Sequence, residues 1–334
     1  MEKLRAGVIG LGIGEQHIEG YQRHPACEVA TLCDISDEKR KMAQKKYPHI
    51  KVTGNADALL EDDQIHIVSI ASYDNHHYEQ MIRALRNGKH VFVEKPLCLY
   101  EKEARHIRSL LKLNPNLKVS SNLILRMSPR FRRLKKMIQE GTFGELFYVE
   151  GDYNYGRLEK ITEGWRGKID FYSVVYGGGV HMVDLLLWLT GDSVVEVTAY
   201  GNRIASKGSR FRYNDLVACL LKFKSGLIGK ITVNMGCVHP HFHPLSVYGT
   251  KGTFVNGIKQ GLVFRSSDPQ KDPEKIVADY PGVHKGDMIP NFINSILNGS
   301  QAEVTEEDIF KTMSVCLAIE KATQQSGSVA VEYI

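Results

Sequence analysis

The chain has 334 residues, enough for two domains that each bury a hydrophobic core. Its composition, 43% hydrophobic and 24% charged with a formal net charge of +5, excludes a fibrous or disordered chain. The mild positive charge permits anionic ligands without indicating a nucleic-acid partner. No apolar run approaches the ~20 residues that span a bilayer, no signal peptide is evident, and the six cysteines form no CxxC pair. We therefore expect a cytoplasmic protein that binds neither membranes nor nucleic acid.

The first third of the chain alternates short apolar runs with helical stretches. The predicted strands are 4–9, 28–33, 65–71 and 90–93, and the predicted helices between them are 15–23, 38–46 and 77–87. Parallel strands joined by helices are buried on both faces, so they consist of continuous apolar residues as these runs do. The pattern therefore predicts an α/β fold that opens with a doubly wound parallel sheet of the Rossmann type.

Ligands of such a sheet bind at the carboxyl ends of its strands. The first strand ends in a glycine cluster in which Gly10 allows a tight turn and Gly12 lets backbone amides approach a pyrophosphate. We expect Gly14 and Ile13 to complete this phosphate-binding turn at the start of the next helix. The spacing is GxGxG, one residue shorter than the usual GxGxxG, which predicts a tighter turn.

An acidic residue follows the second strand. Asp34 is expected to accept hydrogen bonds from the ribose hydroxyls of a dinucleotide and to repel a 2′-phosphate. NAD is therefore favoured as the cofactor, although the nearby Lys39 and Arg40 leave NADP possible.

The fourth strand ends in Glu94–Lys95–Pro96, where the nicotinamide of a bound cofactor is expected. Oxidation of a secondary alcohol removes the hydroxyl proton as the hydride leaves, and a lysine at this point stabilises the charge that develops on the oxygen. We therefore predict Lys95 as a catalytic and substrate-binding residue and Glu94 as a cofactor-binding one. The alternative is a surface lysine paired with its glutamate neighbour.

Three segments, GLGIGEQH at 10–17, ALRNGKHVFVEKP at 84–96 and GGGVHMVD at 177–184, together resemble one known family. This is the glucose–fructose oxidoreductase, inositol dehydrogenase and rhizopine catabolism family, usually called Gfo/Idh/MocA. The resemblance covers nearly the whole chain. It implies a Rossmann domain at 1–122 and, at 123–334, an α+β substrate and oligomerisation domain built on a large, mostly antiparallel open sheet.

The loop after the third predicted strand corresponds to the part of the family's fold along which the adenosine-diphosphate side of the cofactor passes. Ser72 is expected to contact the cofactor there. His77 matches the family's loop histidine, and it is either a cofactor contact or a structural anchor of the following helix.

Alternating strands dominate the second half of the chain. They are predicted at 146–155, 194–200, 216–223, 227–235 and 245–248. Period-two alternation buries one face of a sheet and leaves the other face open. The family resemblance implies that the open face forms a subunit interface, so we expect a homodimer or homotetramer.

A helix is predicted to begin at the glycines 177–179 and to continue to Leu189. His181 is predicted as the catalytic acid or base, and Asp184, three residues later on the same helical face, as a substrate-binding partner. Many family members carry an aspartate four residues before this histidine, and here Gly177 stands in its place. This departure puts the Asp–His proton relay in doubt and leaves its role to Lys95 or to Asp184.

Four further candidates come from the link between domains and from a Trp–Arg pair. Asn122 and Arg126 are either ordinary linker residues or face the cofactor or substrate, and we predict them as substrate-binding residues. Trp165 and Arg166 resemble a family pair near the nicotinamide, and Arg166 is suited to a carboxylate or phosphate on the substrate.

Two clusters are open to more than one interpretation. On an extended chain His239, His241 and His243 face one side, and we favour a substrate pocket, with His243 as a substrate contact, or an oligomer contact over a metal site. The basic run at 130–136 has helical spacing and is predicted to form a solvated helix face.

The resulting prediction is an NAD(P)-dependent oxidoreductase that transfers a hydride between nicotinamide and a hydroxyl or keto carbon of a sugar, sugar nucleotide, inositol or related polyol. The alternatives are an enzyme that recycles tightly bound NAD, in glycoside cleavage or paired oxidoreduction, and a non-catalytic NAD-binding sensor.

Overall fold

The computed structural model describes residues 3–325 and 327–334, which fall into two compact units. The first unit is Met1–Ile124, His284–Phe310 and Ile334, and the second is Leu125–Val283 and Lys311–Tyr333. The division at residue 122 predicted from the sequence stays a prediction, and the compact units differ from it in placing His284–Phe310 with the first unit. That segment packs there closely, since a Cβ on Gly20 would lie 2.5 Å from the carbonyl oxygen of Gly286.

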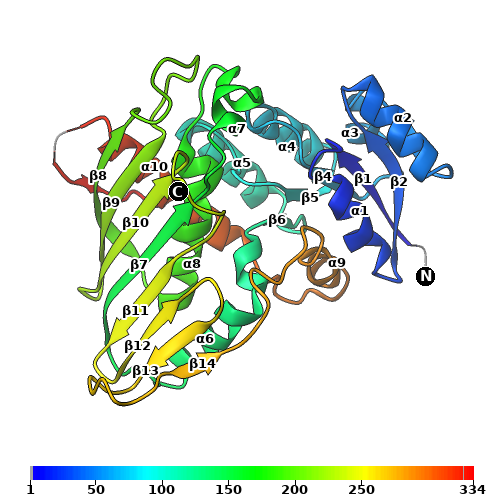
Figure 1. The fold of residues 1–334 in the computed structure, drawn as a ribbon. Helices are drawn as coiled ribbons and strands as arrows, with labels where there is room; N and C mark the ends of the chain where they lie inside the picture. Colours follow the sequence, from blue (N-terminus) through cyan, green and yellow to red (C-terminus); the bar gives the residue numbers. More distant parts are fainter. Residues whose placement is uncertain (1–2, 326) are drawn as a thin grey trace. The chain divides into compact units, whose positions relative to one another are not determined.

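The first unit is built on a six-stranded sheet in the order β3-β2-β1-β4-β5-β6, and every neighbouring pair is parallel (Figure 1). Its strands are β1 Leu4–Ile9, β2 Cys27–Cys33, β3 Lys51–Thr53, β4 Ile67–Ile70, β5 His90–Val93 and β6 Val119–Ser121. Its helices include α1 Glu15–Gln22, α2 Asp37–Lys46, α3 Asp57–Leu60, α4 His77–Arg86, α5 Glu101–Leu113 and α9 Ile289–Asn298. The prediction of a doubly wound parallel sheet is confirmed, and the strand order reverses between β1 and β4, where such sheets bind ligands.

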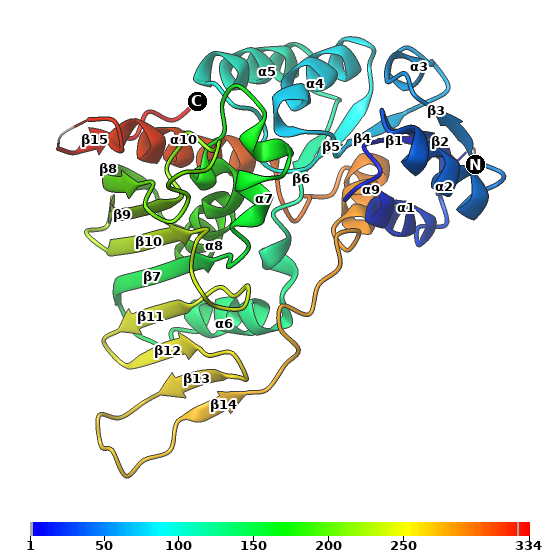
Figure 2. The ribbon, with the colours of Figure 1, turned by 45° about the horizontal axis from the view of Figure 1, so that its top comes forward.

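The second unit is built on a nine-stranded sheet in the order β14-β13-β12-β11-β7-β10-β9-β8-β15 (Figure 2). Its strands are β7 Leu146–Asn154, β8 Val194–Asn202, β9 Leu216–Phe223, β10 Ile228–Asn234, β11 Leu245–Gly249, β12 Gly252–Asn256, β13 Gly261–Phe264, β14 Glu274–Ile276 and β15 Val329–Ala330. Among the described strands of this sheet, β7 and β10 pair in parallel and all other neighbours pair antiparallel. The predicted large, mostly antiparallel sheet is therefore confirmed.

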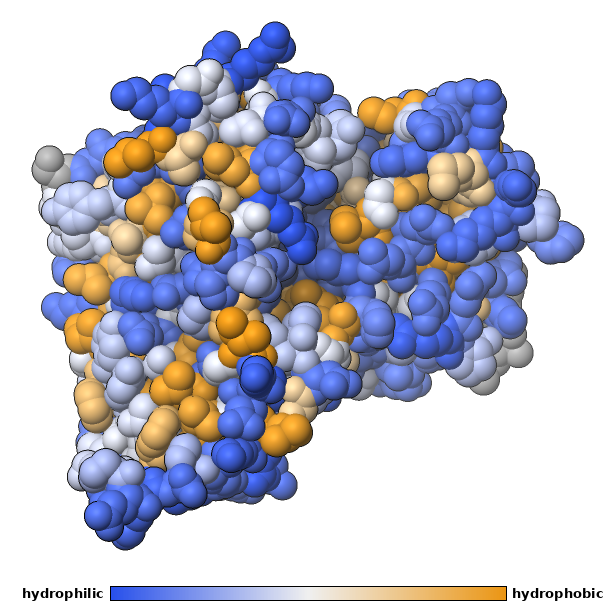
Figure 3. Space-filling view, viewed as in Figure 1, coloured by the Kyte–Doolittle hydropathy of each residue, from blue (hydrophilic) through white to orange (hydrophobic). Residues whose placement is uncertain are grey.

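One face of this sheet is covered by α8 Val180–Thr190. Gly151 of β7 lets the helix approach, since a Cβ there would lie 2.6 Å from Cε of Met182. On the opposite face, every second residue of β9 and β10 points away from α8. Among them, Leu220 is 55% exposed and Ile228 is 41% exposed. Apolar and polar residues are interspersed over the strands of this unit (Figure 3).

The predicted helix at 177–189 forms, but it begins differently from an ordinary α-helix. Its first part is a π-helix, η4 Val175–Gly179, which continues directly into α8. The helix ends at Gly191, whose φ of +68° suits glycine. A π-turn inside a helix often marks a functional site.

The basic run at 130–136 lies on α6 Pro129–Gln139, and the predicted solvated face holds only in part. Arg132 and Arg133 are exposed, but Arg130 is 1% exposed. Its guanidinium donates to Oδ1 of Asn256 at 2.8 Å and to the carbonyl oxygen of Gly257 at 2.7 Å. Arg130 therefore belongs to the core, because its several donors satisfy buried acceptors that no apolar residue would serve.

Among the described residues, no helix combines the length and apolar character needed to cross a bilayer.

Candidate active site

The glycine turn after β1 has the geometry of a phosphate cradle. Gly10 adopts a φ of +89°, and a Cβ on it would lie 2.3 Å from the carbonyl oxygen of Ala71. A Cβ on Gly14 would lie 2.2 Å from the carbonyl oxygen of Gly10, so both positions require glycine. Above Gly12 the space is open, since a Cβ there would meet only Nζ of Lys39, at 3.5 Å. The turn therefore leaves the backbone accessible to a pyrophosphate group.

Asp34 connects the end of β2 to this turn. Its Oδ2 accepts the N–H of Leu11 at 2.7 Å and its Oδ1 accepts the N–H of Ser36 at 2.8 Å. Each carboxylate oxygen retains capacity for a second hydrogen bond, which is what ribose hydroxyls require. Arg40 donates to the carbonyl oxygens of Asp34 and Ile35, whereas Nζ of Lys39 lies 3.5 Å from Oδ2 of Asp34.

Glu94 is the centre of a buried polar network at the end of β5. Nε2 of His17 lies 3.3 Å from Oε1 of Glu94, and Nδ2 of Asn122 donates to the same oxygen at 2.7 Å. Burial alone would raise the pKa of Glu94, but Lys285, His17 and Lys95 outweigh it and hold that pKa well below its usual range. The network therefore keeps a carboxylate ionised inside the protein.

One acceptor of this network is unsatisfied. Oδ1 of Asn122 is buried and has no hydrogen-bond partner among the described residues, while its Nδ2 also donates to the carbonyl oxygen of Lys285 at 3.0 Å. A buried carbonyl oxygen without a donor is costly, and the carboxamide of a nicotinamide carries the N–H group that it lacks. The open glycine turn, Asp34 and this acceptor together fit a dinucleotide.

The loops after β4 and β5 are tied together by His77. Its Nδ1 lies 2.7 Å from the carbonyl oxygen of Pro96 and its Nε2 lies 3.2 Å from that of Ser72. The Lys95–Pro96 peptide bond is cis, and Oγ of Ser72 donates to Gln80 at 2.8 Å. These contacts match the structural alternative for His77, because they hold the turn that follows Lys95.

His181 lies in a cluster of aromatic rings in the second unit. It is 5% exposed, and its ring stacks on that of Tyr153 with centroids 6.2 Å apart. Tyr153 also contacts His241 at 5.2 Å and His243 at 5.3 Å between centroids. Burial raises the pKa of Tyr153 well above its usual value, even though Arg166 lowers it, so the hydroxyl stays protonated. Imidazole and hydroxyl groups therefore lie together here, and both kinds of group can hydrogen-bond to a polar ligand.

The histidine run at 239–243 is not uniformly extended, and its three rings do not share one side. His241 and His243 pair with ring centroids 4.8 Å apart, whereas the ring of His239 lies against Phe242. Bends at 238 and 239 interrupt the alternation that the sequence suggested. Nδ1 of His243 is hydrogen-bonded to the hydroxyl of Tyr280 at 2.7 Å. Across 3–325 and 327–334, no group of three or more metal-ligating side chains is close enough to hold an ion.

The space beside Gly177 is filled by Tyr172. A Cβ on Gly177 would lie 2.0 Å from the Tyr172 hydroxyl oxygen, so an aspartate does not fit at 177 while that ring stays in place. Trp165 packs edge-on to Tyr172 with centroids 6.3 Å apart, and the Arg166 guanidinium lies 4.7 Å from the Trp165 ring centroid. The Trp–Arg pair therefore supports the tyrosine that occupies the place of the missing acid.

Arg126 and Asp184 form a buried ion pair between the 3-10 helix η2 Ile124–Met127 and α8. The guanidinium donates to both carboxylate oxygens, with Nη2 2.6 Å from Oδ1, and the two side chains are 3% and 1% exposed. Thr312 Oγ1 also lies 3.4 Å from Oδ1 of Asp184. The ion pair gives both residues a structural role inside the protein. Their contact with substrate stays a prediction.

Comparison with known proteins decides the family. Residues 4–121 match the model of the oxidoreductase family with an NAD-binding Rossmann fold, and residues 131–255 match the Gfo/Idh/MocA C-terminal domain. The chain belongs to the Gfo/Idh/MocA family. It is an NAD-binding oxidoreductase, as the sequence predicted.

Relatives of this Gfo/Idh/MocA protein include dehydrogenases of cyclic polyols and sugars. The myo-inositol 2-dehydrogenase of Thermotoga maritima is 24% identical over 344 aligned residues that cover 99% of each chain. A crystal structure of myo-inositol 2-dehydrogenase from Lactobacillus plantarum superposes with a TM-score of 0.85 at 21% identity, covering 99% of this chain and 100% of that one. A levoglucosan dehydrogenase bound to NADH and levoglucosan gives 0.87 at 20% identity with the same coverage.

Several residues of the site were missed by sequence reasoning. His17 stands in the GLGIGEQH segment but was assigned no role, and Lys285 is too distant in the chain for any local pattern to place it beside Glu94. Tyr153 carried a usable signal, because alternation along 146–155 puts it on the buried face. Tyr172 carried none, since only the structure shows that it faces Gly177.

Proposed function

We propose that this oxidoreductase is a dehydrogenase or reductase for a secondary alcohol of a polyol or sugar. The observation that carries the proposal is the position of Lys95, directly after β5 and beside the buried carboxylate of Glu94, in a unit whose glycine turn suits NAD. The names of the inositol dehydrogenase relatives support this substrate class. The second unit supplies groups that recognise hydroxyls in what we call the histidine–tyrosine cluster, formed by Tyr153, His181, His241 and His243.

Bound NAD⁺ supplies the acceptor for the hydride. In the proposed mechanism the Lys95 ammonium hydrogen-bonds the substrate oxygen and stabilises the charge that develops on it. The His181 imidazole takes the hydroxyl proton as the carbon loses its hydride, and returns it in the reverse direction. Glu94, held ionised chiefly by Lys285 and His17 and hydrogen-bonded by Asn122, keeps the local potential favourable to the Lys95 ammonium.

Turnover with NAD and NADP, measured by the absorbance of the reduced nicotinamide, tests the proposal with a panel of inositols, neutral sugars, uronic acids and nucleotide sugars. We expect NAD-linked turnover with one substrate class. Binding of NAD without turnover by any member would contradict the proposed activity and favour a sensor or a recycled cofactor.

Replacing Lys95 tests the mechanism itself. Lys95→Met should lower kcat by about 10²–10⁴-fold, the range that general acid–base groups contribute, and leave the Kd for NAD within about threefold. The matched control is Lys102→Met on the exposed side of α5, which should change neither value. Persistent activity in Lys95→Met would show that another group stabilises the substrate oxygen.

A further inference from the structure

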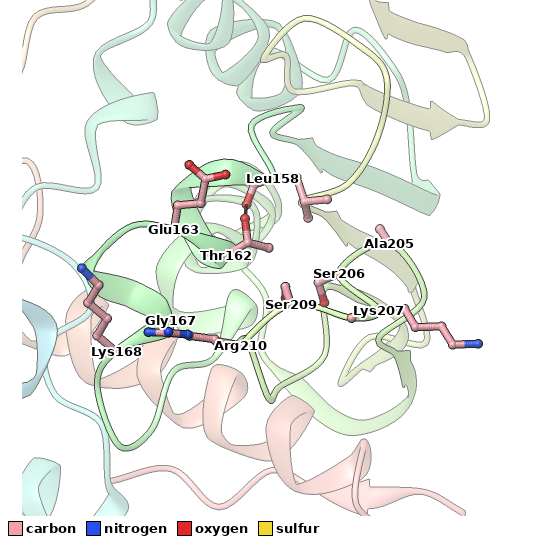
Figure 4. Close-up of a pocket in the computed structure, with 11 residues that line it drawn as sticks. Leu158, Thr162, Glu163, Gly167, Lys168, Ala205, Ser206, Lys207, Ser209 and Arg210 are labelled. Carbon is pink, nitrogen blue, oxygen red and sulfur yellow. Dashed lines mark hydrogen bonds between the residues drawn. The ribbon is translucent and has the colours of Figure 1, made fainter.

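A pocket in the second unit shares no lining residue with the histidine–tyrosine cluster. It has a volume of 630 Å³ and lies between the segment of α7 Glu159–Thr162 and η3 Trp165–Gly167 and the loop that joins β8 to β9 (Figure 4). Its polar lining includes Thr162, Glu163, Lys168, Ser206, Lys207 and Arg210. Nothing in the proposed dehydrogenase mechanism uses these residues.

The charge of the pocket is positive. Lys168, Lys207 and Arg210 line it against a single carboxylate, that of Glu163. In the described part of the chain, none of these three cations has a carboxylate within 4.0 Å. Arg210 extends toward Gly167 and Lys168, while Lys207 points away from them (Figure 4). The positive charges of Lys168 and Arg210 share the pocket and repel each other, and an anion bound between them would offset that repulsion.

The pocket wall also contains an unsatisfied hydroxyl. Ser206 is 2% exposed, and its Oγ has no hydrogen-bond partner among the described residues. Its backbone N–H donates to Oδ2 of Asp215 at 2.6 Å, which fixes the start of the loop. A hydroxyl that lacks an acceptor is a ready donor to an oxyanion, because a rotation about one bond redirects it.

Both segments that line the pocket are adjacent in sequence to residues that pack on Tyr172. Gly167 and Lys168 directly follow Trp165, whose ring packs edge-on to Tyr172. Arg210 directly precedes Phe211, whose ring centroid lies 6.0 Å from that of Tyr172. An occupant of the pocket therefore contacts the two segments that hold Tyr172 over Gly177.

We propose that this pocket binds a phosphate-type oxyanion, with Arg210 and Lys168 as its charged contacts and Ser206 as its hydroxyl donor. The same chemistry has two possible sources, a free phosphate that acts as an effector and the phosphate group of a phosphorylated sugar. The second source rests on the proposed dehydrogenase function, whereas the anion site itself does not.

Calorimetric titration of inorganic phosphate into NAD-saturated protein at low ionic strength tests the site, because bound NAD already fills the glycine turn. We expect saturable binding that Arg210→Gln weakens by about tenfold or more, the usual effect of losing a charge-assisted contact. Glu163→Gln should tighten binding. Arg133→Gln, the same charge change on the exposed face of α6, should leave the Kd within about twofold.

Absence of saturable binding, or equal affinity of Arg210→Gln and wild type for phosphate, would overturn the proposal.

A competition experiment then distinguishes the two sources of the anion, free phosphate and a phosphorylated sugar. A sugar phosphate that displaces inorganic phosphate, where the matching neutral sugar does not, and that is itself oxidised, identifies the substrate's own phosphate. Inorganic phosphate is identified as an effector if it changes the turnover of a neutral polyol and is not displaced by the sugar phosphate. Failure of the titration leaves the absorbance assay for dehydrogenase activity unaffected, so the two proposals fail separately.

Discussion

At the scale of single residues, Glu94 shows how a buried charge depends on its neighbours. Its pKa lies below the ordinary value of 4.5 because Lys285, His17 and Lys95 outweigh the effect of burial. A depressed carboxylate pKa stabilises the folded state at pH values above 4.5, and this stabilisation is lost as the pH falls through the folded-state pKa. The ionised form is therefore part of the folded structure at neutral pH.

Glu94→Gln keeps the shape of the side chain and removes the charge. We expect it to lower the free energy of unfolding by about 2–4 kcal/mol at pH 7, since it leaves nearby cations without their buried counter-charge. The difference from wild type should shrink as the pH falls below 4.5. Urea unfolding of both proteins at pH 7 and pH 3.5 measures it, and a difference that does not change with pH would show that lost packing, not charge, is responsible.

Gly177 offers a second test at this scale. In Gly177→Ala the new methyl group would lie 2.0 Å from the Tyr172 hydroxyl oxygen, so the ring must move. We expect a loss of about 1–3 kcal/mol, despite the better helix propensity of alanine, because overpacking a buried site costs that much. The double variant with Tyr172→Phe should recover part of the loss. Thermal unfolding of the four proteins of this cycle gives the coupling, and strictly additive changes would contradict the contact.

The sequence identified the residues whose role follows from a local motif. Gly10, Gly14 and Asp34 could be predicted because a turn, a helix start and a strand end fix their positions, and the structure gives them matching geometry. Lys285 could not, because its effect on Glu94 depends on a return of the chain more than a hundred residues later. The catalytic roles of Lys95 and His181 stay predictions.

At the scale of elements, the Arg126–Asp184 pair joins η2 to the helix that carries His181. Asp184→Asn would leave the Arg126 guanidinium buried without its counter-charge, so we expect the free energy of unfolding to fall by about 3–5 kcal/mol. Asp268→Asn on an exposed loop removes the same charge and should change stability by less than about 0.5 kcal/mol. Chemical unfolding measures both variants, and similar small losses would mean that the buried pair contributes little.

Strands with a long run of alternating apolar and polar residues were predicted from the sequence, and short elements were missed. The strands β7, β9 and β10 have seven or more residues of clear alternation and were predicted. β3 was missed because it is a three-residue edge strand, Lys51–Thr53, with a polar first residue. The π-helix η4 was missed as well. Its sequence VYGGG could equally begin an α-helix, and only the backbone path of the structure distinguishes the two.

At the scale of the whole molecule, fold class could be predicted because it follows from the order of elements. The assignment of His284–Phe310 to the first unit could not, because α9 reads as an amphipathic helix that either core would accept. Its partner is specified by shape, through the glycine contact of Gly20 with Gly286. Local patterns do not contain that information.

The open face of the nine-stranded sheet is where we predict that copies of the chain associate. Tyr200, Leu220 and Ile228 present apolar surface there. Lys230, the neighbour of Leu220 across β9 and β10, forms an ion pair with Glu150 of β7. A sheet face with this mixture of apolar and paired charged residues suits an isologous contact with a second copy. We therefore expect a homodimer or homotetramer of the 37.6 kDa chain through this face.

Light scattering coupled to size-exclusion chromatography measures the assembly. Leu220→Glu places a charge on this face and should shift the protein toward the monomer mass, since burying an unpaired carboxylate in an interface is costly. Leu113→Glu makes the same change at an exposed position of α5, 76% exposed, and should leave the mass of the assembly unchanged. A wild-type protein of monomer mass would contradict the predicted interface, whereas loss of assembly in both variants would point to general destabilisation, which the unfolding temperature of each variant would reveal.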